Sequence, residues 1–387
     1  MDFEISKQQN MIKNAIAEFM KKECTPEYSR SLDIEKKFPE ELWQKMAEND
    51  FLGISIPEEF GGSGGDILDY VVTIEAISKG SIAVGFGFFL TVCFGGKSIG
   101  FYGTEEQKKF FLPKLASGKC KFALSLTEPG GGTDILGSMQ TSAKIQGDNY
   151  IINGQKTFIS GADVADYFIT VLRTDDNPKK KAEGISVLIV DAKAPGIIVK
   201  PIDKLALRSV SACEVFYDNV KTPKSTLLGK EGQGWYQLVS TLNNERIGVA
   251  AMATGMASGI LEIAVKYAKE RKAFGKPIGQ FQAIQHKLAE RAIELEAARG
   301  LLYKAAWLQS AGKRCDIEAN MAKYFASTVG FDIVSTAITV MGGYGITEEY
   351  DVARHLHIAK GFTFAPISNE MCLNYIGMVG LGLPRCY

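Results

Sequence analysis

The chain has 387 residues, 46% of them hydrophobic, which is enough to fill the cores of two or three domains. Its 44 lysines and arginines balance 44 aspartates and glutamates, so no overall charge draws the protein to nucleic acid or to an anionic membrane. The seven cysteines are odd in number and form no CxxC pair, which argues against a disulfide framework and a zinc site.

The same composition bears on location and metal binding. The first residues carry Asp2 and Glu4 without an apolar run, so we expect no secretory signal and a cytoplasmic protein. The three histidines, His286, His355 and His357, offer only one weak pair at metal-ligand spacing. We therefore predict no metal.

Residues 1–121 are predicted to form a helical domain, because apolar residues recur at the spacing of amphipathic helices, as in IKNAIAEFM. Between Lys79 and Lys97, seventeen residues carry no charge, which approaches the roughly 20 apolar residues of a membrane span. The run is short, rich in glycine, and contains Ser81 and Thr91. We therefore expect a buried core helix and no membrane insertion.

The pattern changes at about residue 122. Short β-rich runs such as YIINGQKTFIS, GISVLIVD and CEVFYDNVKTP are bounded by turn residues, which predicts a β domain over residues 122–234. Residues 235–387 return to long helical periodicity with many alanines and glycines, as in RIGVAAMATGMASG. Small residues let helices approach closely, so we expect a tight bundle that also offers a subunit interface.

Four segments stand out as candidates for ligand binding. LSLTEPGGGTD, over residues 124–134, combines three consecutive glycines with two threonines, a pattern in which backbone N–H groups can approach a ligand closely. GQKTFISGA supplies an aromatic side chain and short polar groups for a flat ring. RKAFGKPIGQFQAIQHKLA and MGGYGI add an arginine at a helix end and a second glycine turn.

Together these four segments, in this order, resemble the acyl-CoA dehydrogenase family of flavoenzymes, and FYGTEEQKKFFLP adds a similar helical stretch. The resemblance covers essentially the whole chain. It implies an α+β multidomain fold with an N-terminal helical domain, a β-barrel-like middle domain and a C-terminal four-helix bundle. It also implies bound FAD, an acyl-CoA thioester as substrate, a homotetramer, and an electron-transferring flavoprotein as partner.

The resemblance also assigns roles to individual positions. Those implied to bind the cofactor are Ser125, Leu126, Thr127, Gly132, Thr133, Phe158, Ile159, Ser160, Arg271, Phe274, Gln282, Thr339, Gly342, Gly343, Ser368 and Glu370. Of these, Arg271, Phe274 and Gln282 match the segment that reaches the FAD of a neighbouring subunit. Phe158 replaces the usual tryptophan, and Thr339 replaces the usual glutamine. Substrate contacts are implied for Thr133, Arg246, Phe89 and Ile367.

The expected base is missing from its usual place. In much of the family it is the glutamate of a Tyr-Glu-Gly-Thr motif near the C-terminus. The flanking residues Ala359, Lys360, Phe362 and Thr363 match without a gap and place Pro366 at the glutamate. Proline has neither a carboxylate nor a backbone N–H, so both the base and one donor to the substrate carbonyl are lost.

A second location for the base exists. Some family members place it immediately before the arginine matched here by Arg246, and LNNERIG puts Glu245 there. We take Glu245 as the candidate base, although such a pair on a helix is often a surface charge. Thr91, within FFLTVCFGG, is a candidate pocket residue, with Cys93 nearby, and neither is a competent base without strong activation.

Three functions are therefore open. The first is FAD-dependent removal of an α-proton and a β-hydride from a branched or cyclic acyl-CoA such as cyclohexane-1-carboxyl-CoA, as in the alicyclic branch of the family. The second is 1,4-dehydrogenation of cyclohex-1-ene-1-carboxyl-CoA, or enoyl-CoA reduction. The third is a catalytically silent FAD and CoA binder. A wall of Phe88, Phe89, Phe94 and Phe362 favours a bulky ring as the acyl group.

Overall fold

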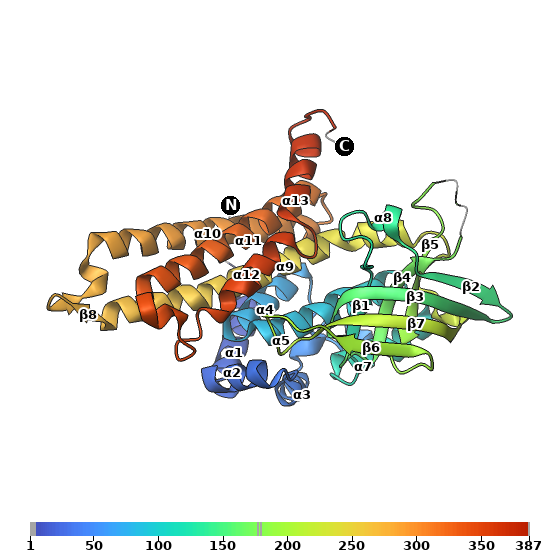
Figure 1. The fold of residues 1–387 in the computed structure, drawn as a ribbon, viewed down its shortest axis with the longest axis horizontal. Coiled ribbons are helices and arrows are strands. Elements are labelled where there is room, and N and C mark those ends of the chain that lie inside the picture. The colour runs from blue at the N-terminus through green and yellow to red at the C-terminus, as the bar shows by residue number, and fades with distance from the viewer. Residues whose placement is uncertain (1–4, 176–177, 179, 386–387) are drawn as a thin grey trace.

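The computed structural model describes residues 5–175, 178 and 180–385. Figure 1 shows three parts: a sheet at one end of the longest axis, long helices at the other end, and a group of N-terminal helices beneath them. This order of helical, β and helical segments is the predicted α+β architecture, and it is confirmed. The domain limits 1–121, 122–234 and 235–387 remain predictions.

The N-terminal part is built from short helices with defined caps. Its elements are α1 Lys7–Glu23, α2 Pro26–Glu35, α3 Glu40–Glu48, η1 Phe51–Gly53, η2 Glu58–Phe60, α4 Ile67–Gly80, α5 Ile82–Phe89, η3 Leu90–Lys97, α6 Ser98–Tyr102 and α7 Glu105–Ala116. Ser6, Asp66 and Thr104 begin α1, α4 and α7 with capping boxes, which satisfy N–H groups at the helix start. Helix α4 is buried along most of its length and forms the centre of this part.

The uncharged run is buried, as predicted, but it is not one regular helix. Its middle, η3, is a π-helix between α5 and α6, a local distortion that is frequent at functional sites. Gly95 packs directly on β1, since a Cβ there would lie 2.5 Å from the Phe122 ring. Within the part of the chain that the structure describes, three helical stretches could cross a membrane by length and composition alone. In Ile82–Tyr102, 83% of the most apolar 18 residues are buried inside the protein.

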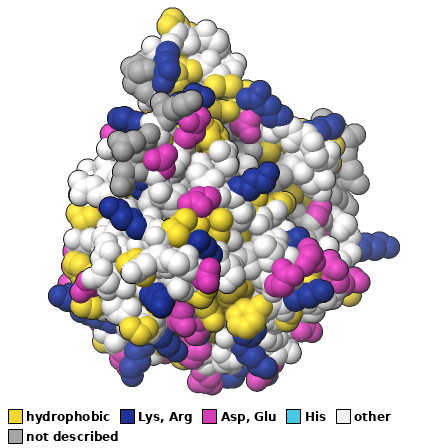
Figure 2. Space-filling view, turned by 90° about the vertical axis from the view of Figure 1, so that its right-hand side faces the viewer, with side chains coloured by type: hydrophobic (Ala, Val, Ile, Leu, Met, Phe, Trp, Pro, Cys, Tyr) yellow, Lys and Arg dark blue, Asp and Glu magenta, His cyan; other side chains and the backbone are white. Residues whose placement is uncertain are grey.

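The middle part is a single branched sheet. Its strands are β1 Phe122–Ser125, β2 Ser142–Gln146, β3 Asn149–Ser160, β4 Tyr167–Arg173, β5 Ile185–Asp191, β6 Ile197–Pro201 and β7 Ala212–Pro223. The order is β1-β4-β2-β3-β7-β6, and β5 also pairs with β4. Among the described residues these pairings form one sheet, which is the middle part of the predicted fold. Figure 2 shows acidic and basic side chains interspersed over this end of the molecule, in keeping with the balanced composition.

The C-terminal part is a bundle around the long helix α9, Gly234–Glu270. The other elements are β8 Lys272–Ala273, β9 Lys276–Pro277, η5 Ile278–Gln280, α10 Gln282–Ser310, α11 Asp316–Met341, η6 Gly342–Ile346, α12 Arg354–Phe364, α13 Asn369–Tyr375 and η7 Ile376–Gly380. Helix α9 packs against α4, α10 and α11. Its middle is nearly all alanine, glycine and methionine and is fully buried, which allows this close approach.

Candidate active site

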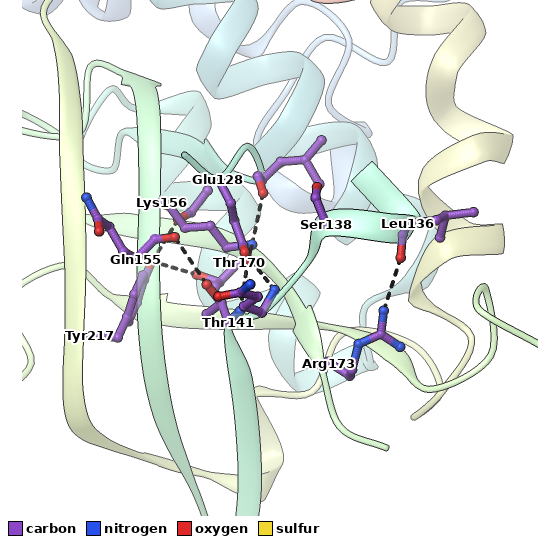
Figure 3. Close-up of polar contacts among 12 residues, drawn as sticks. Glu128, Leu136, Ser138, Thr141, Gln155, Lys156, Thr170, Arg173 and Tyr217 are labelled. Atoms are coloured by element: carbon purple, nitrogen blue, oxygen red, sulfur yellow. Dashed lines mark hydrogen bonds and ion pairs between the residues drawn. The ribbon is translucent and has the colours of Figure 1, made fainter. Parts of the chain in front are cut away.

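The glycine-rich segment forms a loop between β1 and the short helix α8, Ile135–Ser138. At its start, the Ser125 hydroxyl is hydrogen-bonded to the Tyr217 hydroxyl at 2.8 Å. The Thr157 N–H donates to the Thr127 carbonyl at 2.8 Å and ties the loop to β3. Gly132 and Thr133 are exposed at the tip. The structure therefore brings the first two predicted flavin-binding segments side by side, as Figure 3 shows for their anchoring contacts.

Phe158 is presented by an irregularity in β3. The register with β7 shifts between Lys156 and Ile159, and Phe158 has a φ of 57°, in the left-handed region that a bulky residue rarely adopts. Its ring is 66% exposed. Bulges of this kind re-aim side chains next to active sites. Ile159 points the other way into the sheet core and is 2% exposed, so only its backbone is available to a ligand.

The second glycine turn lies at the far end of the bundle. Thr339, Gly342 and Gly343 line a hollow of about 530 Å³ together with Arg271 and Tyr344. The Arg271 guanidinium lies 5.8 Å from the centre of the Tyr344 ring, a cation–π arrangement. The Thr339 hydroxyl donates a hydrogen bond to the Ser335 carbonyl of its own helix.

The β8–β9 hairpin carries Phe274, which is 95% exposed and has a φ of 51°. Gln282, at the start of α10, is also exposed. Figure 1 places this hairpin at the opposite end of the molecule from β2. Within one chain, the structure therefore separates Phe274 from the glycine-rich loop, so the predicted cofactor residues form two groups.

Glu245 is buried on α9, which removes the possibility that it is an ordinary surface charge. Burial raises its pKa from 4.5 to about 7, against the opposing effect of the Arg246 and Lys323 charges. A carboxylate with this pKa is half ionised near neutral pH, which suits a general base. Sequence analysis identified the residue, and the structure supplies the environment that could activate it.

Two N-terminal helices contact α9 one turn after Glu245. A Cβ at Gly248, one turn after Glu245, would lie 2.7 Å from the Tyr70 hydroxyl and 2.9 Å from the Phe89 ring. Phe89 in turn packs edge-to-face on Phe94, with the ring centres 5.2 Å apart. Aromatic rings from α4, α5 and η3 therefore lie against α9 one turn after Glu245, and the substrate contact of Phe89 stays a prediction.

Two polar groups in this region are buried without a hydrogen-bond partner within the described ranges. The Tyr70 hydroxyl and the Arg246 Nε each lack a hydrogen-bond partner among the described residues. Buried donors are rarely left unpaired, because each costs about 1–3 kcal/mol. The Arg246 Nε is therefore a candidate donor to a ligand, whereas Tyr70 is fully buried with its hydroxyl beside Cys93. Sequence analysis assigned Arg246 to the substrate but missed Tyr70. Tyr70 lies in an apolar helical segment, a pattern that indicates only a core position.

At the usual base position, the loop carries Pro366, which has neither a carboxylate nor a backbone N–H. Pro366 is exposed and follows a cis peptide bond with Ala365. Beneath it, the buried Lys323 donates to the Ile367 carbonyl at 2.5 Å and to the Asn369 side chain at 2.8 Å. This occupies the carbonyl of Ile367, a predicted substrate contact.

Ser368 and Glu370 follow at the start of α13. The Ser368 hydroxyl accepts the Met371 N–H and caps the helix. Glu370 is exposed, and its own backbone N–H and the Ser368 hydroxyl hold its pKa below the usual value. Glu370 is therefore an ionised surface carboxylate and lacks the burial that distinguishes Glu245.

Thr91 lies in the π-helix and is 2% exposed. Its Oγ1 accepts the Phe122 N–H at 3.4 Å, so the hydroxyl connects η3 to β1. Cys93 is buried nearby, and burial together with the Glu245 charge raises the pKa of its thiol. A thiol held in this form is not a base.

The described residues contain no group of three His, Cys, Asp or Glu side chains placed to hold a metal ion. His355 is half-buried beside Arg354, and desolvation together with that charge lowers its pKa to about 3. Its Nδ1 lies 2.7 Å from the Asp351 carbonyl. His355 is therefore neutral and structural at physiological pH.

The glycine-rich loop, the exposed Phe158 and the hollow beside Arg271 have the chemistry that a dinucleotide with a flat ring requires. Family models describe the N-terminal, middle and C-terminal domains of acyl-CoA dehydrogenase and match residues 6–119, 123–220 and 232–381. The chain belongs to the acyl-CoA dehydrogenase family and is an oxidoreductase. Members of this family bind FAD, and solved relatives include FAD complexes.

Individual relatives span nearly the whole chain. It is 40% identical over 350 residues to a 3-(aryl)acrylate reductase of Clostridium sporogenes, covering 90% of this chain and 92% of that one. It is 39% identical to a subunit of the caffeyl-CoA reductase-Etf complex of Acetobacterium woodii, covering 92% and 94%. The butyryl-CoA dehydrogenase structure from Megasphaera elsdenii is 36% identical, with a TM-score of 0.94 over 98% of this chain and 100% of that one.

Proposed function

We propose that this protein is an FAD-dependent acyl-CoA oxidoreductase in which Glu245 is the base that removes the proton beside the thioester carbonyl. The observation that carries the proposal is the burial of Glu245 on α9, which raises its pKa to about 7. The exposed Pro366 at the usual base position cannot take a proton. The coarse activity, oxidation or reduction of acyl-CoA thioesters, is that of the family.

The other parts of the reaction are assigned to the cofactor and to residues near Glu245. FAD, when bound, supplies the acceptor for the hydride that leaves the carbon next to the deprotonated one. The Glu245 carboxylate takes the α-proton, and Lys323 and Arg246 stabilise its ionised form. The unpaired Nε–H of Arg246 is free to donate to the thioester portion of the substrate. Phe89 and Phe94 exclude water from the acyl group.

For the acyl group we propose a bulky branched or cyclic chain, such as cyclohexane-1-carboxyl. The support is the group of buried aromatic rings beside α9, one turn after Glu245, formed by Tyr70, Phe89 and Phe94. A second candidate is reduction of an enoyl-CoA, or 1,4-dehydrogenation of a cyclic enoyl-CoA. It is favoured by the relatives at about 40% identity that are named as reductases.

The test is anaerobic reduction of the bound flavin by a panel of linear, branched, cyclohexane-carboxyl and cyclohexene-carboxyl thioesters. Wild-type protein is expected to bleach with one of the saturated branched or cyclic members. Glu245→Gln should retain FAD and lose bleaching by at least about a hundredfold, the usual contribution of a general base. Glu18→Gln, which changes an exposed carboxylate on α1, is the matched control. Normal turnover by Glu245→Gln would show that the base lies elsewhere.

We also propose a cytoplasmic homotetramer that exchanges electrons with an electron-transferring flavoprotein. The assembly is supported by Phe274, fully exposed on a hairpin at the far end of the chain from the glycine-rich loop. A second copy could bring the two groups of cofactor residues together. The partner is supported by the relative whose complex includes Etf. Mass determination in solution and flavin reoxidation by an electron-transferring flavoprotein test the two points.

A further inference from the structure

A lysine is buried inside the β domain, directly beneath the glycine-rich loop. Lys156 lies on β3, and its side chain is 0% exposed. Its Nζ donates to the Leu126 carbonyl at 2.9 Å and to the Glu128 carboxylate at 2.9 Å. One ammonium group therefore holds two residues of the loop's first limb (Figure 3).

Glu128 extends this anchor to the other limb of the loop. Its carboxylate accepts the Gln140 N–H at 2.6 Å and the Thr141 N–H at 2.9 Å, and its side chain is 7% exposed. Charge-assisted hydrogen bonds of this kind are short and strong. The glycine tip and α8 lie between Glu128 and Gln140, so one carboxylate closes the base of the whole loop.

The neighbouring strand completes the arrangement. The Thr157 N–H bonds the Thr127 carbonyl, and the Thr141 hydroxyl donates to the Gln155 carbonyl at 3.3 Å. Lys156 lies between these two contacts and directly before the irregularity that exposes Phe158. Any movement of Lys156 would therefore be transmitted to both cofactor-facing segments.

Stability alone does not account for this pair. Burial lowers the pKa of Lys156 to about 8, while Lys156 and the two N–H groups keep the pKa of Glu128 below its usual value. Both groups are thus charged at neutral pH, and desolvation opposes that state. Replacing such a buried pair with apolar residues is often neutral or stabilising, whereas removing one partner is costly. A geometric role fits these facts better.

We propose that Lys156 and Glu128 are positioning residues for the flavin: together they hold the glycine-rich loop and the Phe158 bulge in the arrangement that binds the cofactor. The inference rests on the proposed placing of FAD at this loop. It is independent of Glu245, because the hydrogen bonds described above for Lys156 and Glu128 lie within the β domain and its loop.

The test compares single variants with an apolar double variant. Lys156→Met and Glu128→Leu should each lower the thermal midpoint, because each leaves one buried charge unpaired. The double variant Lys156→Met/Glu128→Leu should recover the midpoint but bind FAD at least about tenfold more weakly, with a shifted flavin reduction potential. If the pair were merely structural, restoring the stability would also restore flavin binding. Restored stability with impaired flavin binding therefore indicates a positioning role.

The matched control is the ion pair of Glu75 with Arg299, in which the Arg299 Nε lies 2.7 Å from Glu75 Oε1 in the helical part of the molecule. Glu75→Leu/Arg299→Met should leave FAD affinity and potential unchanged. The proposal is overturned if the Lys156/Glu128 double variant binds FAD with wild-type affinity and potential, or if the control double variant loses as much. Neither outcome bears on the bleaching test for Glu245.

Discussion

Glu245→Gln should stabilise the protein at alkaline pH while it abolishes proton removal. The folded protein holds the Glu245 proton more tightly than the unfolded chain does, because burial raises its pKa from 4.5 to about 7. Ionisation therefore costs folding free energy, and the cost grows as pH rises from 4.5 through 7. Glutamine has nearly the same shape and carries no charge, so the variant escapes this cost.

The magnitude follows from the two pKa values. The difference between 4.5 and about 7 corresponds to roughly 3 kcal/mol, at about 1.4 kcal/mol per pH unit. The full gain is expected above pH 7, and most of it should disappear by pH 5, where the wild-type carboxyl is protonated. For a protein of this size, such a gain raises the thermal midpoint by roughly 4 °C.

The assay is urea or thermal unfolding of wild type, Glu245→Gln and Glu18→Gln at pH 5 and pH 8, all saturated with FAD. Glu18 is exposed in the middle of α1, so its variant measures how stability changes when an exposed carboxylate is removed. A stability difference between wild type and Glu245→Gln that is the same at both pH values would refute the argument from burial.

Two further predictions follow. Because Glu245 must be ionised to act, kcat/KM for oxidation should rise about tenfold per pH unit below about 7 and level off above it; a profile that levels off near 4.5 would contradict the assignment. Phe158→Gly should relieve the left-handed backbone at that position yet weaken FAD binding in equilibrium dialysis, whereas Phe158→Trp should keep it; unchanged affinity in the glycine variant would exclude stacking by Phe158.

Much of the organisation could be predicted from the sequence, because it is recorded in local patterns. Helical periodicity and β-rich runs predicted the order of the three parts, and the motifs placed the glycine-rich loop and the second glycine turn. The replacement of the usual glutamate by Pro366, and the presence of Glu245 before Arg246, are also visible in the sequence. Lys156 is visible in the sequence as well, as a charge on the apolar face of an alternating strand.

The chemistry of these residues was decided by tertiary structure. A glutamate beside an arginine on a helix has the same sequence whether it faces water or a core. Glu245 is buried only where α9 packs against its neighbours in the folded protein, among them α4 and α11, and this burial raises its pKa. The same holds for Lys156, whose partner Glu128 lies 28 residues away in the chain. Desolvation and charge pairing depend on neighbours distant in sequence, so composition and local pattern could name these residues but not assign their roles.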